Sequence, residues 1–264
     1  MSSATDPAPP ALHAAGALDH RVALVTGAGR NIGRAIAIAL AGAGADVAVN
    51  VRENRAEGQQ TVDEITRAGG NAILVVGDIS ESANVESMIA AVRTELGPLT
   101  ILVNNVGVRP RQALQDITDE DWRYVLDAGL GGAFYCARAA SHDMIEQGWG
   151  RIITLSGRDA FTGLSHRAHG VSSKAAVHGL TKALALELGP SGITANTIVP
   201  GYINTYRPRE WYPNHDHAKR VAGIPVGRGG HVVDIANTAI FLAAYGSYIN
   251  GQALHVNGGE FLIG

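Results

Sequence analysis

The feature that most constrains this chain is a glycine-containing turn between an apolar strand and an apolar helix. Residues 26–33 read TGAGRNIG; they end the β-rich run Val22 to Thr26 and open an Ala/Ile/Leu-rich helical pattern from Ile32 to Ala43. Glycine lets the backbone turn tightly and approach a pyrophosphate, and the first turn of a helix offers free N–H donors. The glycines alone would also suit an ordinary turn, but strand, turn and helix in register favour a nucleotide-binding site.

Short β-rich runs alternate with helical patterns through the rest of the chain, which is typical of a parallel sheet. We therefore expect an α/β fold, a Rossmann-like doubly wound sheet of seven parallel strands with helices on both faces, whose ligands bind beyond the carboxyl ends of the strands. The expected later strands are Asp46 to Val51, Ala72 to Val76, Ile101 to Asn104, Arg151 to Ser156, Thr194 to Val199 and Ala253 to Val256. The expected later helices are Arg55 to Ala68, a long run from Thr118 to Gln147, and Ser172 to Leu188.

Composition limits the partners and the compartment. Residues 1–17 are rich in Ala, Pro and Ser and predict a flexible tail, leaving residues 18–264 as a single domain. The tail does not resemble a signal peptide, and no later stretch has the length of a membrane span. A formal net charge of −3 without a Lys/Arg-rich block argues against nucleic acid and favours a small-molecule ligand. We expect a soluble, cytoplasmic protein whose single cysteine, Cys136, is packed in a helix.

The end of the second expected strand bears on cofactor choice. It reads Asn50-Val51-Arg52, so no carboxylate is present to repel a 2′-phosphate, and Arg30 and Arg52 are placed to bind one. The sequence therefore predicts NADP(H) as the preferred cofactor, with NAD(H) as the alternative. Either arginine would equally suit a solvated surface charge.

Further motifs give the chain a family resemblance. The turn, Asp78, Asn104-Asn105-Val106-Gly107, Lys174 and the segment from Pro200 to Thr205 together resemble the short-chain dehydrogenase/reductase family over residues 19 to 260. In that family the turn binds the dinucleotide phosphates, the Asp contacts adenine, and the Pro-Gly segment contacts the nicotinamide amide. The cofactor-binding residues that the resemblance implies are Gly27, Arg30, Asn31, Ile32, Gly33, Arg52, Asp78, Ile79, Asn105, Gly107, Lys174, Pro200, Gly201, Ile203 and Thr205. Asn31 replaces the turn's second glycine and is acceptable there because Asn adopts positive φ.

The resemblance fails at the catalytic positions. Family members use Asn, Ser, Tyr and Lys, with Tyr as the acid or base and Ser holding the substrate oxygen. On the matching positions this chain has Gly129, Gly157 and Gly170, and it keeps only Lys174. A general acid or base contributes roughly 10² to 10⁴ in rate, so an ordinary carbonyl reductase is not the expected function.

Replacement groups lie in the stretch from Arg158 to His169. Asp159 with His169 or His166 would form a new acid/base pair, and Arg109, Arg111 or Arg158 would hold a carboxylate or phosphate. The alternative is a loop whose charges face water. No metal site is expected, because His215 and His217 have no third ligand at suitable spacing.

Two further expectations concern the surroundings of the site. The irregular segment from Asn204 to Arg228 is either a substrate lid or a packed surface excursion. The helical runs Trp122 to Met144 and Ser172 to Leu188 match the surfaces that relatives use to assemble, which implies a homodimer or homotetramer.

Three functions remain open from the sequence. The first is an NADP(H)-binding enzyme with rebuilt acid/base chemistry, either non-redox or atypical redox, that acts on a polar carbonyl or hydroxy compound, an anionic one among the options. Its candidate catalytic residues are Lys174, His169 and Asp159. The second is a non-catalytic nucleotide-binding or regulatory subunit. The third is an NADPH-dependent carbonyl reductase in which a neighbouring residue or water replaces the Tyr.

Overall fold

A single parallel sheet forms the centre of the molecule. The structure, a computed structural model, describes residues 9, 11, 12, 14–206 and 217–262. Seven strands lie in the order β3-β2-β1-β4-β5-β6-β7, and every neighbouring pair is parallel. The chain starts in the middle of the sheet, builds outward to β3, and returns to β4 beside β1. This reversal is the topological switch point at which doubly wound folds bind their ligands.

The elements follow the expected alternation of strand and helix. The strands are β1 Val22–Val25, β2 Asp46–Val51, β3 Ala72–Val76, β4 Ile101–Asn104, β5 Gly150–Leu155, β6 Ile193–Pro200 and β7 Ala253–Val256. The helices are α1 Asn31–Gly42, α2 Arg55–Arg67, α3 Ser82–Glu95, α4 Asp119–Leu126, α5 Gly132–Glu146, α6 Asp159–Thr162, α7 Ala168–Leu188, α8 His217–Val221 and α9 Val232–Ile240. Short helical turns complete the set: η1 Leu114–Asp116, η2 Asp127–Gly131, η3 Gly189–Ser191 and η4 Phe241–Tyr245.

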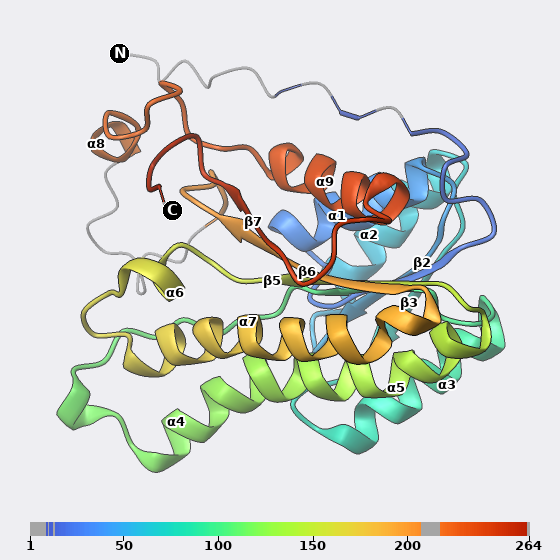
Figure 1. The fold of residues 1–264 in the computed structure, drawn as a ribbon, viewed down its shortest axis with the longest axis horizontal. Helices are drawn as coiled ribbons and strands as arrows, with labels where there is room; N and C mark the ends of the chain where they lie inside the picture. The colour runs from blue at the N-terminus through green and yellow to red at the C-terminus, as the bar shows by residue number, and fades with distance from the viewer. Residues whose placement is uncertain (1–8, 10, 13, 207–216, 263–264) are drawn as a thin grey trace.

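Helices cover both faces of the sheet (Figure 1). On one face α1 and α9 pack together through Ile36, Leu40, Ile235 and Ala239, which belong to one apolar core. On the other face α3, α5 and α7 form a second core that includes the fully buried Cys136, as the sequence predicts. Strands β1, β4, β5 and β6 are buried along their whole length, which explains why they appear in the sequence as continuous apolar runs.

The long helix expected from Thr118 to Gln147 is interrupted. It is divided by η2, a π-helical turn that contains Gly129 and separates α4 from α5. A π turn is often found at a functional site, and it holds one residue more than an α-helical turn. The glycines of this segment have no side chains that would hinder this insertion. In addition, α7 begins at Ala168 rather than Ser172, so Gly170 lies in its first turn.

The end of the expected N-terminal tail lies against the domain. Leu12 N–H donates to Asn237 Oδ1 at 2.8 Å, and Ala14 is buried in the core that contains α1 and α9.

Among the described residues no helix has the length and apolar character needed to cross a membrane.

Candidate cofactor and substrate site

A cavity of about 900 Å³ opens at the carboxyl ends of β1, β4, β5 and β6. Its walls come from the turn after β1, the segments after β4, β5 and β6, helix α7 and the residues around α8. Twelve of the fifteen residues predicted to bind cofactor line it: Gly27, Arg30, Asn31, Ile32, Gly33, Asn105, Gly107, Lys174, Pro200, Gly201, Ile203 and Thr205. The fold therefore brings the predicted phosphate-binding and nicotinamide-binding segments to one space.

The glycine-containing turn has the conformation expected for close approach to a phosphate. Gly27 and Asn31 have φ values of 61° and 52°, so Asn31 adopts the left-handed conformation as predicted for a residue in place of glycine. A Cβ at Gly33 would overlap the carbonyl oxygen of Gly27, so helix and turn pack too closely for a side chain. The Asn105 amide donates to the carbonyls of Thr26 and Gly27 at 3.0 and 3.2 Å and fixes the turn to β4.

The three remaining predicted cofactor residues lie outside the cavity wall. Arg52 donates to the Tyr124 hydroxyl at 2.8 Å and pairs with Glu53 at 3.0 Å. Asp78 accepts from the main chain and hydroxyl of Ser80 at 2.9 and 2.8 Å. Ile79 is buried in the second core. These contacts tie the adenine side of the predicted site to α4 and to the start of α3.

Of the three glycines at the positions that the resemblance assigns to catalysis, two face open space in the described part of the chain. A Cβ at Gly157 would meet nothing within 4 Å, and one at Gly170 would meet only the carbonyl oxygen of Val108, at 4.0 Å. Both residues line the cavity. Among the described residues, no side chain lies within 4 Å of either Cβ position, so the cavity is open at the positions that the resemblance assigns to Ser and Tyr.

Gly129 behaves differently. A Cβ there would overlap the Ser173 hydroxyl, which is buried without a hydrogen-bond partner in the described part of the chain. Ser173 therefore occupies the space next to the position that the resemblance assigns to Asn. An unpaired buried hydroxyl is costly, by about 1 to 3 kcal/mol.

Ser156, the neighbour of Gly157, lines the cavity wall, but its hydroxyl is engaged with α7. It donates to the main-chain carbonyl of Lys174 at 2.8 Å and contacts His178 Nε2 at 2.9 Å. The side chain is fully buried. It therefore serves the packing of β5 on α7 and does not replace the hydroxyl absent at Gly157.

Lys174 lies at the inner wall of the cavity. Its ammonium group donates to the main-chain carbonyls of Val106 at 3.1 Å and Leu155 at 2.6 Å. Burial, with a smaller contribution from the positive charge of Arg109, lowers the pKa of Lys174 to about 7. Lys174 is thus a titrating group near neutral pH in the same cavity as Gly157 and Gly170.

His169 and Asp159, predicted as a pair, have different partners in the structure. His169 is fully buried; its Nδ1 accepts the N–H of Gly170 at 2.9 Å, so its Nε2 carries the proton and donates to Gln112 Oε1 at 2.9 Å. Burial lowers the pKa of His169, which favours this neutral form. Gln112 in turn donates to Asp121 at 2.8 Å. His169 therefore fastens the segment after β4 to the start of α7.

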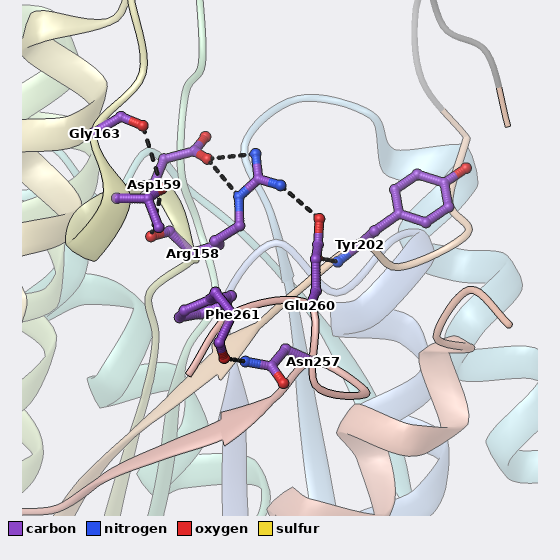
Figure 2. Close-up of polar contacts among 8 residues, drawn as sticks. Arg158, Asp159, Gly163, Tyr202, Asn257, Glu260 and Phe261 are labelled. Carbon is purple, nitrogen blue, oxygen red and sulfur yellow. Dashed lines mark hydrogen bonds and ion pairs between the residues drawn. The ribbon is translucent and has the colours of Figure 1, made fainter. Parts of the chain in front are cut away.

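Asp159 belongs to a cluster built around Arg158 (Figure 2). The Arg158 guanidinium donates to Asp159 Oδ1 at 3.1 and 3.2 Å and to Glu260 Oε1 at 2.5 Å. The other oxygen of Glu260 accepts the main-chain N–H of Tyr202 at 2.7 Å. Sequence reasoning missed Glu260, whose only signal is its place shortly after the last strand. One carboxylate thus joins the segment after β5 to the predicted nicotinamide segment after β6.

The cavity wall is rich in positive charge. Arg30, Arg109, Arg111, Arg158, Arg167, Lys174, Lys219 and Arg220 line it, against the carboxylates of Asp159 and Glu260. Arg109 and Arg111 are exposed and have no ion pair with a carboxylate in the described residues.

His166, with φ of 61°, accepts the N–H of Gln112 at its carbonyl and does not line the cavity. The expected lid falls partly outside the described residues, and so does His215, but Thr205, Lys219, Arg220 and Gly223 contribute to the wall.

Comparison with known proteins agrees with this geometry. The family model described as enoyl-(acyl carrier protein) reductase matches residues 27–260. The 3-oxoacyl-[acyl-carrier-protein] reductase FabG of Staphylococcus aureus (strain Mu50) is 38% identical over 91% of this chain and 98% of its own length. FabG of Escherichia coli (strain K12) is 35% identical over 92% of this chain and 98% of its own length.

Solved structures are similarly close. A gluconate 5-dehydrogenase from Burkholderia cenocepacia J2315, in complex with NADP and tartrate, superposes with a TM-score of 0.85 at 33% identity, covering 92% of this chain and 96% of that chain. A short-chain type dehydrogenase/reductase from Mycobacterium marinum gives 0.83 at 35% identity, covering 93% and 97%. Fold and site define a nicotinamide-cofactor oxidoreductase scaffold. The chain belongs to the short-chain dehydrogenase/reductase family.

Proposed function

We propose that this protein is an NADP(H)-dependent oxidoreductase of a small anionic hydroxy or oxo compound, in which Lys174 takes the proton-transfer part that the family gives to Tyr. The observation that supports this most is the shared cavity. It joins the phosphate-binding turn, Lys174 and the Pro200–Thr205 segment to the open space at Gly157 and Gly170.

The residues present fit a phosphorylated dinucleotide. Gly27, Asn31 and Gly33 leave the helix N-terminus accessible, and the end of β2 carries Arg52 instead of a carboxylate. Arg30 lines the cavity, 3.9 Å from Glu57 and half-exposed, so it is able to turn toward a 2′-phosphate. We therefore propose NADP(H) as the preferred cofactor.

A bound nicotinamide would supply or accept the hydride. In this chain Lys174 is held by two carbonyls at the cavity wall, and a pKa of about 7 lets it give up or take a proton at neutral pH. The open position at Gly170 leaves room for a water molecule between the Lys174 amine and the substrate oxygen. Asp159 and His169 are each engaged elsewhere, so they act in this proposal by positioning.

The charge of the cavity favours an anionic substrate. Arg109 and Arg111 project from the segment after β4 and line the cavity without carboxylate partners in the described chain. Arg158 is already balanced by Asp159 and Glu260. A carboxylate or phosphate on the substrate would therefore bind Arg109 or Arg111. The similarity to a gluconate 5-dehydrogenase solved with tartrate is in keeping with a hydroxy acid.

A two-stage experiment tests the proposal. Fluorescence titration of the full chain with NADPH and NADH measures cofactor binding, and a direct assay of NADPH oxidation against oxo acids and uncharged ketones measures turnover. We expect tighter binding of NADPH and turnover confined to oxo acids. Failure of both cofactors to bind contradicts the proposal, and so does a preference for uncharged ketones.

A second candidate is a non-catalytic nucleotide-binding subunit. It is favoured by the surroundings of two nearby hydroxyls, neither of which is placed to replace the missing catalytic groups. The Ser156 hydroxyl is bonded to α7, and the Ser173 hydroxyl is buried beside Gly129. A binder of this kind binds NADPH but shows no turnover with any oxo acid or ketone in the wild-type chain, which separates it from the first candidate.

A further inference from the structure

The amine of Lys174 has an unusual combination of surroundings. It is nearly buried, yet it lines the cavity, and it donates hydrogen bonds to two main-chain carbonyls. Within the described residues no carboxylate lies within ion-pair distance of it. The carbonyls of Val106 and Leu155 thus accept two N–H hydrogen bonds from the amine. No carboxylate among the described residues stabilises the protonated form by pairing with it.

The space beside this amine is accessible to a ligand. In the family pattern a Tyr one helical turn before the Lys, and a Ser from β5, would stand between the amine and the substrate. Here both positions are glycine and a Cβ at either would meet open space. A small carbonyl compound is therefore able to bring its carbon to the nitrogen.

We propose that Lys174 is also a nucleophilic amine, which condenses with small anionic aldehydes or oxo acids in this cavity to form an imine. This activity goes beyond hydride transfer and requires no cofactor. Lysines that are buried or lie next to another cationic group are the usual carriers of such chemistry.

The step is balanced without a further reactant. The nitrogen lone pair forms a bond to the carbonyl carbon, and the carbonyl electron pair moves to oxygen. A proton passes from nitrogen to that oxygen to give a carbinolamine. The hydroxyl then leaves with a second proton as water, and the carbon–nitrogen double bond forms. The open cavity supplies solvent for both proton movements and accepts the released water.

Charge provides the selectivity for anionic carbonyl compounds. Arg109, which faces Lys174 closely enough to lower its pKa, and Arg111 both line the cavity and lack carboxylate partners in the described chain. The positive charge of Lys174 is also one of the causes that lower the pKa of His178. With a pKa of about 7, about half of the Lys174 amine is uncharged at neutral pH, whereas an ordinary lysine is almost wholly protonated.

The sequence makes the test unusually clean, because the chain contains only three lysines, Lys174, Lys182 and Lys219. Lys182 is a matched control, since it lies on the same helix α7 and is exposed. The full chain, free of cofactor, is incubated at pH 7 with glyoxylate and cyanoborohydride, which reduces an imine to a stable secondary amine. Peptide mass spectrometry then measures carboxymethylation at each lysine.

We expect labelling of Lys174 to exceed that of Lys182 by at least about tenfold. Uncharged acetaldehyde should show a smaller excess, and Arg109→Ala with Arg111→Ala should reduce the excess seen with glyoxylate. Lys174→Arg should remove the label and leave Lys182 labelling unchanged. Equal labelling of the three lysines, or none at Lys174, overturns the proposal. Titrating the same preparation with NADPH shows separately whether the proposed cofactor site is intact.

Discussion

The hydroxyl of Ser156 donates a hydrogen bond of 2.8 Å to the main-chain carbonyl of Lys174. The hydroxyl of the residue before Gly157 is thus engaged with the helix that carries Lys174. Gly157 and Gly170, at the positions that the resemblance assigns to Ser and Tyr, face open space among the described residues. The two positions can therefore be tested by introducing those side chains.

Restoring both side chains should restore reductase activity. In Gly157→Ser with Gly170→Tyr, the new Cβ atoms meet no close neighbour, and Lys174 is placed one helical turn after the new Tyr. We expect NADPH-dependent reduction of an oxo acid to rise by about 10² to 10⁴. Gly179→Tyr is a matched control, since it lies on the same helix and is equally unobstructed. A rise in the control as large as in the double variant would show that the effect is not specific to the site.

Lys174 should make stability depend on pH in an unusual direction. Its pKa is about 7 in the folded chain and 10.5 in the ordinary state, so between these values the unfolded chain binds one more proton. Stability from this group is therefore complete above pH 10.5, falls as the pH drops, and levels off below about pH 7.

The measurement compares thermal unfolding of wild type and Lys174→Met from pH 7 to pH 10. Because other titrating groups are common to both proteins, their difference isolates Lys174. We expect the Met variant to lose the dependence and to gain most, relative to wild type, at pH 7. Parallel curves for the two proteins would mean that Lys174 is protonated in the folded state.

Cofactor preference should depend on Arg30 and Arg52. Removing a guanidinium that binds a 2′-phosphate costs roughly 1.5 to 3 kcal/mol. We expect Arg30→Ala and Arg52→Ala to weaken NADPH binding at least about tenfold and to leave NADH binding nearly unchanged. Arg67→Ala, on the exposed side of α2, is the control. An equal loss for both cofactors would argue that the arginines support the fold and not the phosphate.

His169 should act through structure. Replacing it by Ala leaves Gln112 Oε1 and the Gly170 N–H without their partner, at a cost of about 1 to 3 kcal/mol. Because burial lowers its folded pKa, its contribution to stability is present above the ordinary pKa of 6.5 and is lost as the pH falls below that value.

Denaturant unfolding at pH 7.5 and pH 5 checks both statements. The Ala variant should be less stable at pH 7.5 and should show a smaller loss on acidification than wild type. If the variant instead keeps its stability and loses turnover with a changed pH–rate profile, His169 is an acid or base after all.

The features that the sequence predicted correctly depend mostly on local sequence. The order of strands and helices, the left-handed Asn31 and the buried Cys136 are confirmed, because each depends on neighbours within a few residues. The π turn at Gly129 was not predicted, since its glycines fit an α-helix pattern nearly as well.

Contacts between distant residues were not predictable in the same way. His169 pairs with Gln112, 57 residues earlier, and Arg158 with Glu260, 102 residues later. Spacing along the chain suggested that His169 and Asp159 would meet, but the fold gives each a partner from another segment. The sequence shows which side chains are charged or polar, but only the tertiary structure shows which of them pair with one another.

The two unobstructed glycines have a consequence for protein engineering. At Gly157 and Gly170 a new side chain displaces no existing atom at its first carbon, and neither position has a positive φ. Residues as different as cysteine, histidine and glutamate are therefore admissible there at little cost in packing. Because Lys174 lines the same cavity, the protein is a suitable scaffold for designing new reactions, with one functional group added at a time.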